Sequence, residues 1–479
     1  MACGLHMCAN PMRSLLFSSL VLASLTAAAC SSETTVVQAP PATPEDQTPA
    51  SPPPPPATDP PPPPAPPFNP AFPTVLSRGG PVIKTPKIVP IVFASDTQQM
   101  KTDIATFTKK LAASTFWSDT TGEYGVGKLT ALDPIVVNEA PGTTITSAQI
   151  ETWLAGKLSG ASPAFGQPDP NTLYAIFYPS GVSITMDGAG EMGQSCEGYG
   201  GYHYEITAGA TKVGYAVLPR CSTLDDLTVA TAHEAFEWAT DPFPTSEPAF
   251  AKLDDDHWAW QAAMIGELGD LCTFLDLDYP VPADIGYAVQ RLWSNKLSQA
   301  GSFPCGPKKN VAYITTVAEA TDDAYVPDYA AHNTYIKTKA IRVKPGTSRT
   351  VKTHVYSDDM SAKPVAVYAM NMEELYHKPN TTGFSYQMSK APQPVGAVVE
   401  LTINAPTTAS MDVLMMATVT SAREATYWPV LITNDDAQNA VGGQPSVTPE
   451  MMPRTRDMLR TLRGPRVTRL GLARSLASR

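Results

Sequence analysis

The sequence predicts a mixed α+β fold, in which a domain of strands and helices over 82–307 is followed by a small all-β sandwich over 308–434. Apolar runs typical of buried strands alternate with helical patterns before Cys305. After Cys305, short runs rich in Thr, Val and Tyr are separated by Gly, Pro, Asn and Asp, which is the pattern of a sandwich. Hydrophobic residues make up 43% of the 479 residues, which is enough for a sizeable core.

The expected elements of the mixed domain follow one another along the chain. Folded sequence begins near Val82, and the first strand reads KIVPIVFAS. A helical pattern covers 97–113, and a second helix opens with Ser147 as its cap and closes on Gly160. Further strand candidates read LTALDPIVVN and NTLYAIFYPSGVSIT. The run YEITAGATKVGYAVLP predicts a hairpin that turns near Gly209.

The N-terminal segment, residues 1–30, is typical of an export signal. From Met12 it reads MRSLLFSSLVLASLTAAAC, with one basic residue, an apolar run and small residues before Cys30. Its length and flanks suit a signal peptide and not a membrane span. A cysteine directly after three alanines resembles a bacterial lipoprotein processing site, so we expect Cys30 to carry a lipid anchor. Ala27 stands where leucine is usual, and plain cleavage after Ala29 is the alternative.

Two segments of unusual composition flank the expected domains. Residues 31–81 contain PPPPPATDPPPPPAPP, which favours a stiff polyproline spacer without a core. A lipid followed by such a spacer predicts a protein of the bacterial cell envelope, held on a surface, or secreted if it is not lipidated. Residues 435–479 carry eight arginines after Met451 and predict a disordered tail, with contact to anionic lipid or polymer as the alternative.

Charge and cysteine content limit the class of protein further. The formal net charge is −11, which argues against a nucleic-acid binder. Four cysteines remain in an exported chain, and they imply two disulfides. Close spacing in sequence favours the pairs Cys196–Cys221 and Cys272–Cys305, each of which brackets a candidate motif. None has CxxC spacing, which disfavours cysteine as a zinc ligand.

The segment 231-TAHEAFEWATDP-242 suggests a metal site on a helix. A cap at Ser222-Thr223 and the break at Pro242 predict a helix of about 17 residues. His233 and Glu237 are four residues apart and project from one face, so both can bind one ion. Glu234 lies about 100° round the helix, where it can reach a metal-bound water as a general base. The flanks are largely apolar, which disfavours the alternative of a solvated helix face, because buried acids are costly unless they are paired or bind metal.

A metal bound there needs a third protein ligand. We expect it to be Glu267 in 264-MIGELGDLC-272, where glycines let the backbone approach closely. Asp270, three residues on, is expected to support that ligand or to replace it. Asp241 could contribute only if the helix end unwinds, and His203 in GGYHYE is a fourth candidate. His257 is expected at the surface.

These motifs together resemble a known family. HEAFEWATDP, a following tryptophan and GELGDLC, with SCEGYGGYHYE, YAVLP and YAVQRLWSN, resemble bacterial secreted HExxE-type zinc metallopeptidases of zincin-like fold. Plant phosphate-induced, exordium-like proteins are more distantly similar. The resemblance covers about 82–307 and implies His233 and Glu237 as ligands, Glu234 as base, and the Glu267–Asp270 segment as the rest of the site. A longer acidic insertion between Pro242 and Gly266 sets this chain apart.

The resulting hypothesis is a surface-anchored zinc metallopeptidase that acts on a peptide or protein substrate. Glu234 would activate zinc-bound water, with His203 and Tyr204 as weak candidates for an oxyanion partner. One histidine and two carboxylates cancel the charge of Zn²⁺ and make its water less acidic, so Ca²⁺ or Mn²⁺ in a structural role is also considered. The alternative is a non-enzymatic cell-surface binding protein with a structural metal site.

Overall fold

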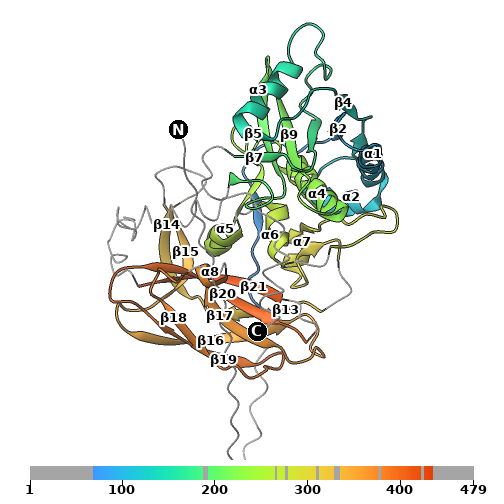
Figure 1. The fold of residues 1–479 in the computed structure, drawn as a ribbon. Helices are drawn as coiled ribbons and strands as arrows, with labels where there is room; N and C mark the ends of the chain where they lie inside the picture. Colours follow the sequence, from blue (N-terminus) through green and yellow to red (C-terminus); the bar gives the residue numbers. More distant parts are fainter. Residues whose placement is uncertain are drawn as a thin grey trace, which may run out of the picture. The chain divides into compact units, whose positions relative to one another are not determined.

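The computed structural model describes residues 68–186, 193–264, 267–275, 279–308, 312–327, 335–375, 379–421 and 425–434 (Figure 1). These residues belong to one compact unit that contains both helices and several sheets, which confirms the mixed α+β class. Among the described helices, none is both long enough and apolar enough to cross a membrane. The expected signal peptide with Cys30, the proline-rich run to residue 67 and the arginine-rich tail lie outside the described residues. The features expected for these three segments, and the domain boundary at residue 307, stay predictions.

A six-stranded sheet organises the first part of the described chain. Five of its strands are neighbours in the order β3 (Thr130–Ala131), β2 (Lys87–Phe93), β6 (Thr172–Tyr178), β9 (Thr211–Pro219), β8 (Tyr202–Ala208). The sixth strand, β4 (Ile135–Val137), also pairs with β2. Strands β2, β6 and β9 are parallel, whereas β8 runs antiparallel to β9 at the edge. The β8–β9 turn lies at Gly209, which has φ +64° and so adopts the left-handed conformation that favours glycine.

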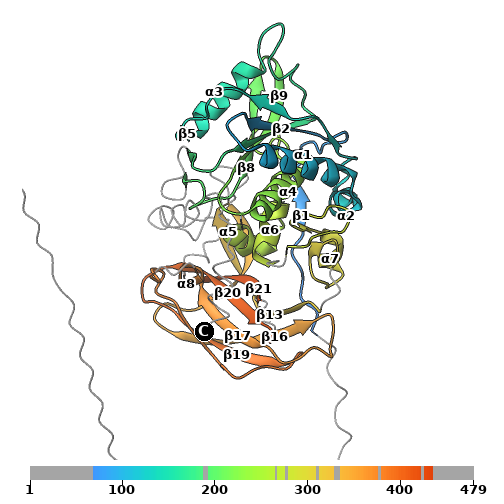
Figure 2. The same cartoon turned by 45° about the vertical axis from the view of Figure 1, so that its right-hand side comes forward.

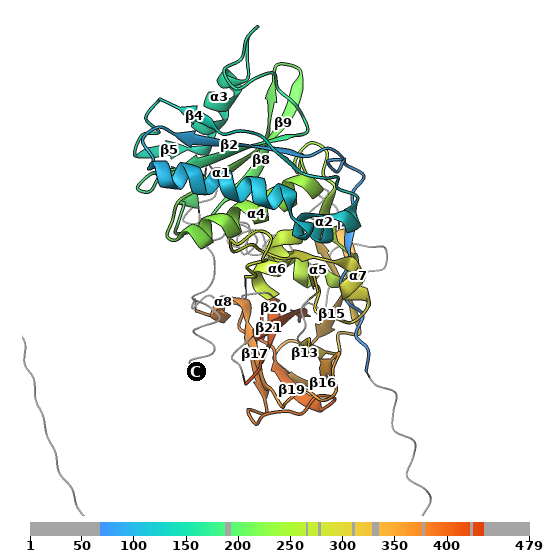
Figure 3. The ribbon, with the colours of Figure 1, turned by 90° about the vertical axis from the view of Figure 1, so that its right-hand side faces the viewer.

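Helices cover both faces of this sheet. Ile88 and Val92 of β2 share a core with helices α1 (Gln98–Ala113) and α4 (Leu224–Thr240). The alternate residues of β2 face the opposite way and pack with α3 (Ser147–Lys157). Figure 3 shows α1 and α4 on one face of the sheet and α3 on the other. Burial on both faces explains why the strands read as continuous apolar runs.

Short elements connect these layers and the site. They are β1 (Val75–Ser77), α2 (Thr115–Thr121), η1 (Gly122–Tyr124), β5 (Thr144–Thr146), β7 (Ser183–Thr185), β10 (Phe250–Leu253), η3 (Asp255–His257), α5 (Trp258–Met264), α6 (Leu268–Leu275), β11 (Leu292–Trp293), α7 (Asn295–Gln299) and β12 (Cys305–Gly306). Three two-stranded sheets join β1 to β10, β5 to β7 and β11 to β12.

The described fold differs from the sequence-based expectation at three places. It begins before Val82, because β1 pairs with β10 and Val75 is buried. Helix α3 is capped by Thr146 and not by Ser147, since Thr146 and Gln149 satisfy each other's backbone N–H groups in a capping box. His257 is partly buried, with its ring nitrogens near Asp254 and the carbonyl of Ala71.

The described residues between 314 and 433 form mainly two sheets, as Figure 2 shows. The first has the order β13 (Ile314–Ala318), β16 (Ser348–Ser357), β19 (Val398–Asn404), β18 (Ser385–Met388). The second has the order β14 (Asp322–Pro327), β15 (Tyr335–Arg342), β21 (Ala425–Thr433), β20 (Met411–Val419), β17 (Ala366–Asn371), with the short helix α8 (Met372–Leu375) after β17. Residues of both sheets enter one apolar core. Burial alternates along β19, as the period-two pattern predicts, whereas β20 and β21 are buried along nearly their whole length.

Candidate metal centre

Helix α4 carries the HExxE motif, and local sequence fixes both of its ends. Thr223 caps the first turn through a reciprocal capping box with Asp226. The helix ends at Thr240, immediately before Asp241 and Pro242, so the predicted length is confirmed. Trp238 lies against Gly214 of β9, where an added Cβ would be 2.2 Å from the indole Nε1. The absence of a side chain at Gly214 therefore lets α4 pack closely on the sheet.

The two predicted helix ligands lie side by side. His233 Nε2 is 3.1 Å from Glu237 Oε2 and 4.0 Å from Asp270 Oδ1. Donor atoms of these three residues all lie within 4.8 Å of one another, so the group could hold a metal ion. Asp270 of helix α6 therefore completes the group that contains His233 and Glu237. The sequence analysis expected Asp270 either to support Glu267 or to replace it as the third ligand.

Glu267 belongs to a second group, which shares Glu237 with the first. Its donor atoms and those of His203 and Glu237 also lie within 4.8 Å of one another. His203 comes from the edge strand β8 and places Nδ1 3.7 Å from Glu237 Oε2. The structure thus brings the predicted ligands His233, Glu237, Glu267 and Asp270 together with His203, but in two overlapping sets.

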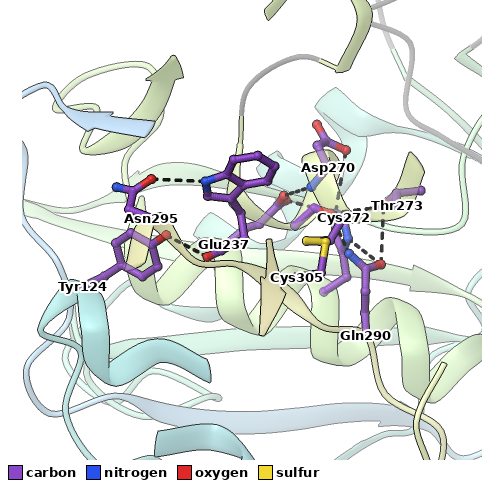
Figure 4. Close-up of a disulfide and its surroundings, with 11 residues drawn as sticks. Tyr124, Glu237, Asp270, Cys272, Thr273, Gln290, Asn295 and Cys305 are labelled. Atoms are coloured by element: carbon purple, nitrogen blue, oxygen red, sulfur yellow. Dashed lines mark hydrogen bonds and ion pairs between the residues drawn. A yellow bond between two sulfur atoms is a disulfide. The ribbon is translucent and has the colours of Figure 1, made fainter. Parts of the chain in front are cut away.

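The second oxygen of Glu237 is held by the start of α6. The backbone N–H of Asp270 donates to Glu237 Oε1 at 2.9 Å, which leaves Oε2 facing both histidines. Figure 4 shows Glu237 beside Asp270 in this arrangement. Gly269 makes the close approach possible, because a Cβ there would lie 2.7 Å from Glu237 Oε1 and 3.0 Å from His233 Nδ1.

Gly269→Ala is expected to weaken metal binding by at least tenfold and to destabilise the fold, since overpacking typically costs about 1–3 kcal/mol. A matched control is Gly156→Ala in α3, where an added Cβ meets no described heavy atom within 4 Å and alanine improves helix propensity. Zinc affinity by chelator competition and melting temperature measure both effects. Equal zinc affinity in the two variants would contradict the close packing inferred at Gly269.

Both predicted disulfides are present, and each anchors an element of the site. Cys272 lies in α6, two residues after Asp270, and is bonded to Cys305 of β12 (Figure 4). Cys196 precedes β8 and is bonded to Cys221, just before the cap of α4. Disulfides of this kind are typical of proteins that fold in an oxidising compartment outside the cytoplasm.

Negative charge dominates the cluster. Five carboxylates face two imidazoles: Glu234, Glu237, Asp241, Glu267 and Asp270 against His203 and His233. Burial raises the pKa of Glu267 well above its ordinary value, and the neighbouring carboxylates add to that shift. Burial would lower the pKa of His233, but Glu237 and Glu234 outweigh it and raise that pKa. Without a cation the cluster therefore retains protons, which a divalent ion would displace on binding.

Asp241 has left the helix, as its predicted contribution required. Its backbone is not helical, with φ −148° and ψ 69°. Oδ1 accepts a hydrogen bond from the backbone N–H of Ala249 at 2.6 Å. Oδ2 is buried and has no hydrogen-bond partner among the described residues. Asp241 is in neither donor group, and its charge helps to raise the pKa of His203 and of Glu267.

Glu234 is oriented by residues outside the motif. Glu234 Oε2 is 3.3 Å from His203 Nδ1, and Oε1 is 4.0 Å from His233 Nε2. An added Cβ at Gly201 would lie 3.1 Å from Glu234 Oε1, so that glycine leaves room for the carboxylate. Tyr204, a weak oxyanion candidate, is half-exposed, and its hydroxyl accepts from Thr245 Oγ1. Alternation along β8 turns it away from the side occupied by His203.

Gln290 is a site residue that the sequence reasoning did not single out. It is buried between α4 and α6 and contacts His233, Gly269 and Thr273. It is 57 residues from His233, so helical spacing gives no hint of it. The segment YAVQRLWSN, which contributed to the family resemblance, was the available signal.

Comparisons with known proteins do not assign a family. The chain matches no protein-family profile and no curated protein. A solved structure described as "Crystal structure of the S-layer protein SbsC domains 4 and 5" is similar over 30% of this chain and 82% of that chain. The identity is 10% and the TM-score is 0.15, a level at which the likeness supports no inference about fold or function.

Proposed function

We propose that this protein is an exported zinc-dependent hydrolase that cleaves peptide bonds, with His233, Glu237 and Asp270 as ligands. The observation that carries the proposal is the helical His233–Glu237 pair, completed by Asp270 within 4.8 Å, with Glu234 beside it. Glu267 is a further ligand candidate through Glu237.

The donor set suits zinc in both type and spacing. Zinc binds imidazole nitrogen and carboxylate oxygen at about 2.0–2.2 Å, so two tetrahedral ligands lie about 3.3 Å apart. The separation of His233 Nε2 and Glu237 Oε2 is 3.1 Å, and that of His233 Nε2 and Asp270 Oδ1 is 4.0 Å. Small side-chain rotations would bring all three atoms to ligand distance. Hard oxygen donors also leave Ca²⁺ and Mn²⁺ as alternative ions.

A bound zinc ion would polarise a substrate carbonyl and make a coordinated water more acidic. Glu234 would accept the proton of that water, and the 4.0 Å distance from its Oε1 to His233 Nε2 supports this role. His203 Nδ1 faces Glu234 Oε2 and would hold the carboxylate in this orientation. His203 therefore has a supporting role in the proposal, and no oxyanion partner is assigned.

Fold and compartment support the same proposal at a coarser level. A mixed sheet with an antiparallel edge strand beside the motif helix is compatible with the zincin-like fold implied by the resemblance. Two disulfides suit an exported chain. A peptide or protein substrate remains the class that the resemblance implies.

One observation favours the alternative, a binding protein with a structural metal. The side chains of His203, Glu234 and Glu237 are only 3%, 6% and 4% exposed. His233 and Asp270 are 14% and 15% exposed, so any access for substrate is on their side. Structural metal sites are closed, whereas catalytic sites keep one open position.

Metal removal separates the two functions. We expect the full chain, purified without added metal, to contain one zinc ion by mass spectrometry and to release peptides from a broad peptide library. A chelator should abolish the release, and added zinc should restore it. A folded, zinc-loaded protein that cleaves no member of the library would favour the structural site, and a folded protein that binds no divalent ion would refute both readings.

A further inference from the structure

Gln290 joins the two helices that carry the proposed ligands. Its side-chain nitrogen donates to the carbonyl oxygen of Gly269 in α6 at 2.6 Å. Its oxygen lies 3.0 Å from His233 Nδ1 of α4 and accepts from Thr273 Oγ1 at 3.3 Å (Figure 4 shows Gln290 and Thr273). The residue is 3% exposed, so water cannot replace these contacts freely.

The contacts fix which end of the amide faces which partner. A backbone carbonyl only accepts hydrogen bonds, so the NH₂ group of Gln290 must face Gly269. The reversed amide would place two acceptor oxygens 2.6 Å apart. The carbonyl oxygen of Gln290 therefore faces His233.

This orientation selects one nitrogen of His233. Because Gln290 Oε1 is an acceptor, His233 Nδ1 must carry a proton to bond with it. The nitrogen left to bind a cation is Nε2, which faces Glu237 Oε2 and Asp270 Oδ1. We propose that Gln290 is a positioning residue that holds His233 with Nδ1 protonated and so presents Nε2 to the metal ion. This inference rests on the proposed metal site.

The other histidine of the cluster faces a carboxylate of the cluster itself and not an amide. His203 turns Nδ1 toward Glu234, and its Nε2 has no hydrogen-bond partner among the described residues. The selection by Gln290 therefore concerns His233 alone. Hydrogen bonds to the distal nitrogen of a ligating histidine typically change metal affinity by about 10- to 100-fold when they are lost.

Two substitutions separate positioning from a merely structural link between α4 and α6. Gln290→Leu removes the hydrogen bonds to His233, Gly269 and Thr273, and we expect zinc affinity to fall about 10- to 100-fold. Gln290→Glu keeps an acceptor for His233 Nδ1 but places a second acceptor against the Gly269 carbonyl. Positioning predicts that Gln290→Glu retains most of the zinc affinity lost in Gln290→Leu. A structural link predicts that both variants lose it to a similar degree.

The measurements are zinc affinity by chelator competition and ¹⁵N spectra of histidine-labelled full chain loaded with ¹¹³Cd²⁺. In the unsubstituted protein, cadmium should couple to His233 Nε2, and Nδ1 should keep its proton. Coupling to Nδ1, unchanged affinity in Gln290→Leu, or equal losses in the two variants would overturn the positioning role while leaving the metal site intact. A protein that is folded but binds neither cadmium nor zinc would overturn both this inference and the proposed function.

Discussion

Glu237→Ala is expected to abolish stoichiometric metal binding and to lower the melting temperature. Glu237 is the one residue that belongs to both donor groups, and its Oε2 faces both histidines. Its Oε1 also accepts the backbone N–H of Asp270. An ion that binds only the folded state stabilises it by about 4 kcal/mol when its concentration is 1,000 times Kd. Loss of the ion and loss of the carboxylate that faces His233 therefore both lower the stability of the folded state.

Asp225→Ala is the matched control, because Asp225 is an exposed carboxylate on the same helix. Its removal should leave the metal content unchanged and shift the melting temperature only slightly. Metal content by mass spectrometry and thermal unfolding with and without zinc are the measurements. Full zinc occupancy in the Glu237 variant would remove Glu237 from the ligand set.

Glu234→Gln is expected to lower peptide cleavage by about 10²- to 10⁴-fold, the usual contribution of a general base. Glutamine keeps the size of the side chain and an acceptor toward His203 Nδ1, but it cannot take a proton from water. Glu234 lies outside both three-residue donor groups, so the variant should keep its zinc and its melting temperature. Turnover on the peptide library, normalised to zinc content, measures the effect.

Two results would count against this role of Glu234. Loss of zinc from Glu234→Gln would make Glu234 a ligand and move the base elsewhere. Unchanged turnover in a variant with full zinc content would show that another group accepts the proton. His203, whose Nδ1 is 3.3 Å from Glu234 Oε2, is a candidate for that group.

Features within one helix or one short loop could be predicted from the sequence. Helix α4, with its cap at Thr223 and its end before Pro242, follows from local capping and proline chemistry. The adjacency of His233 and Glu237 follows from the 3.6-residue period. The strands of the central sheet follow from continuous apolar runs, and sequence proximity was enough to pair the four cysteines.

Contacts between distant segments were decided only by the tertiary structure. The sequence of the segment 267–270 could not show whether Glu267 or Asp270 would face His233, because that depends on how α6 packs on α4. Packing places the Asp270 N–H on Glu237 and sends Glu267 toward His203.

Gln290 and β1 show the same limit. Gln290 and β1 each contact segments that lie tens or hundreds of residues away in the sequence. Neither segment carries a periodic pattern from which those contacts could be predicted. Periodicity records which face of an element is buried, whereas the partner on that face is chosen by chain closure and close packing over the whole domain. The sequence by itself therefore determined the motif helix and the adjacency of His233 and Glu237, and the tertiary structure determined the third residue of the candidate donor group and the amide that contacts His233.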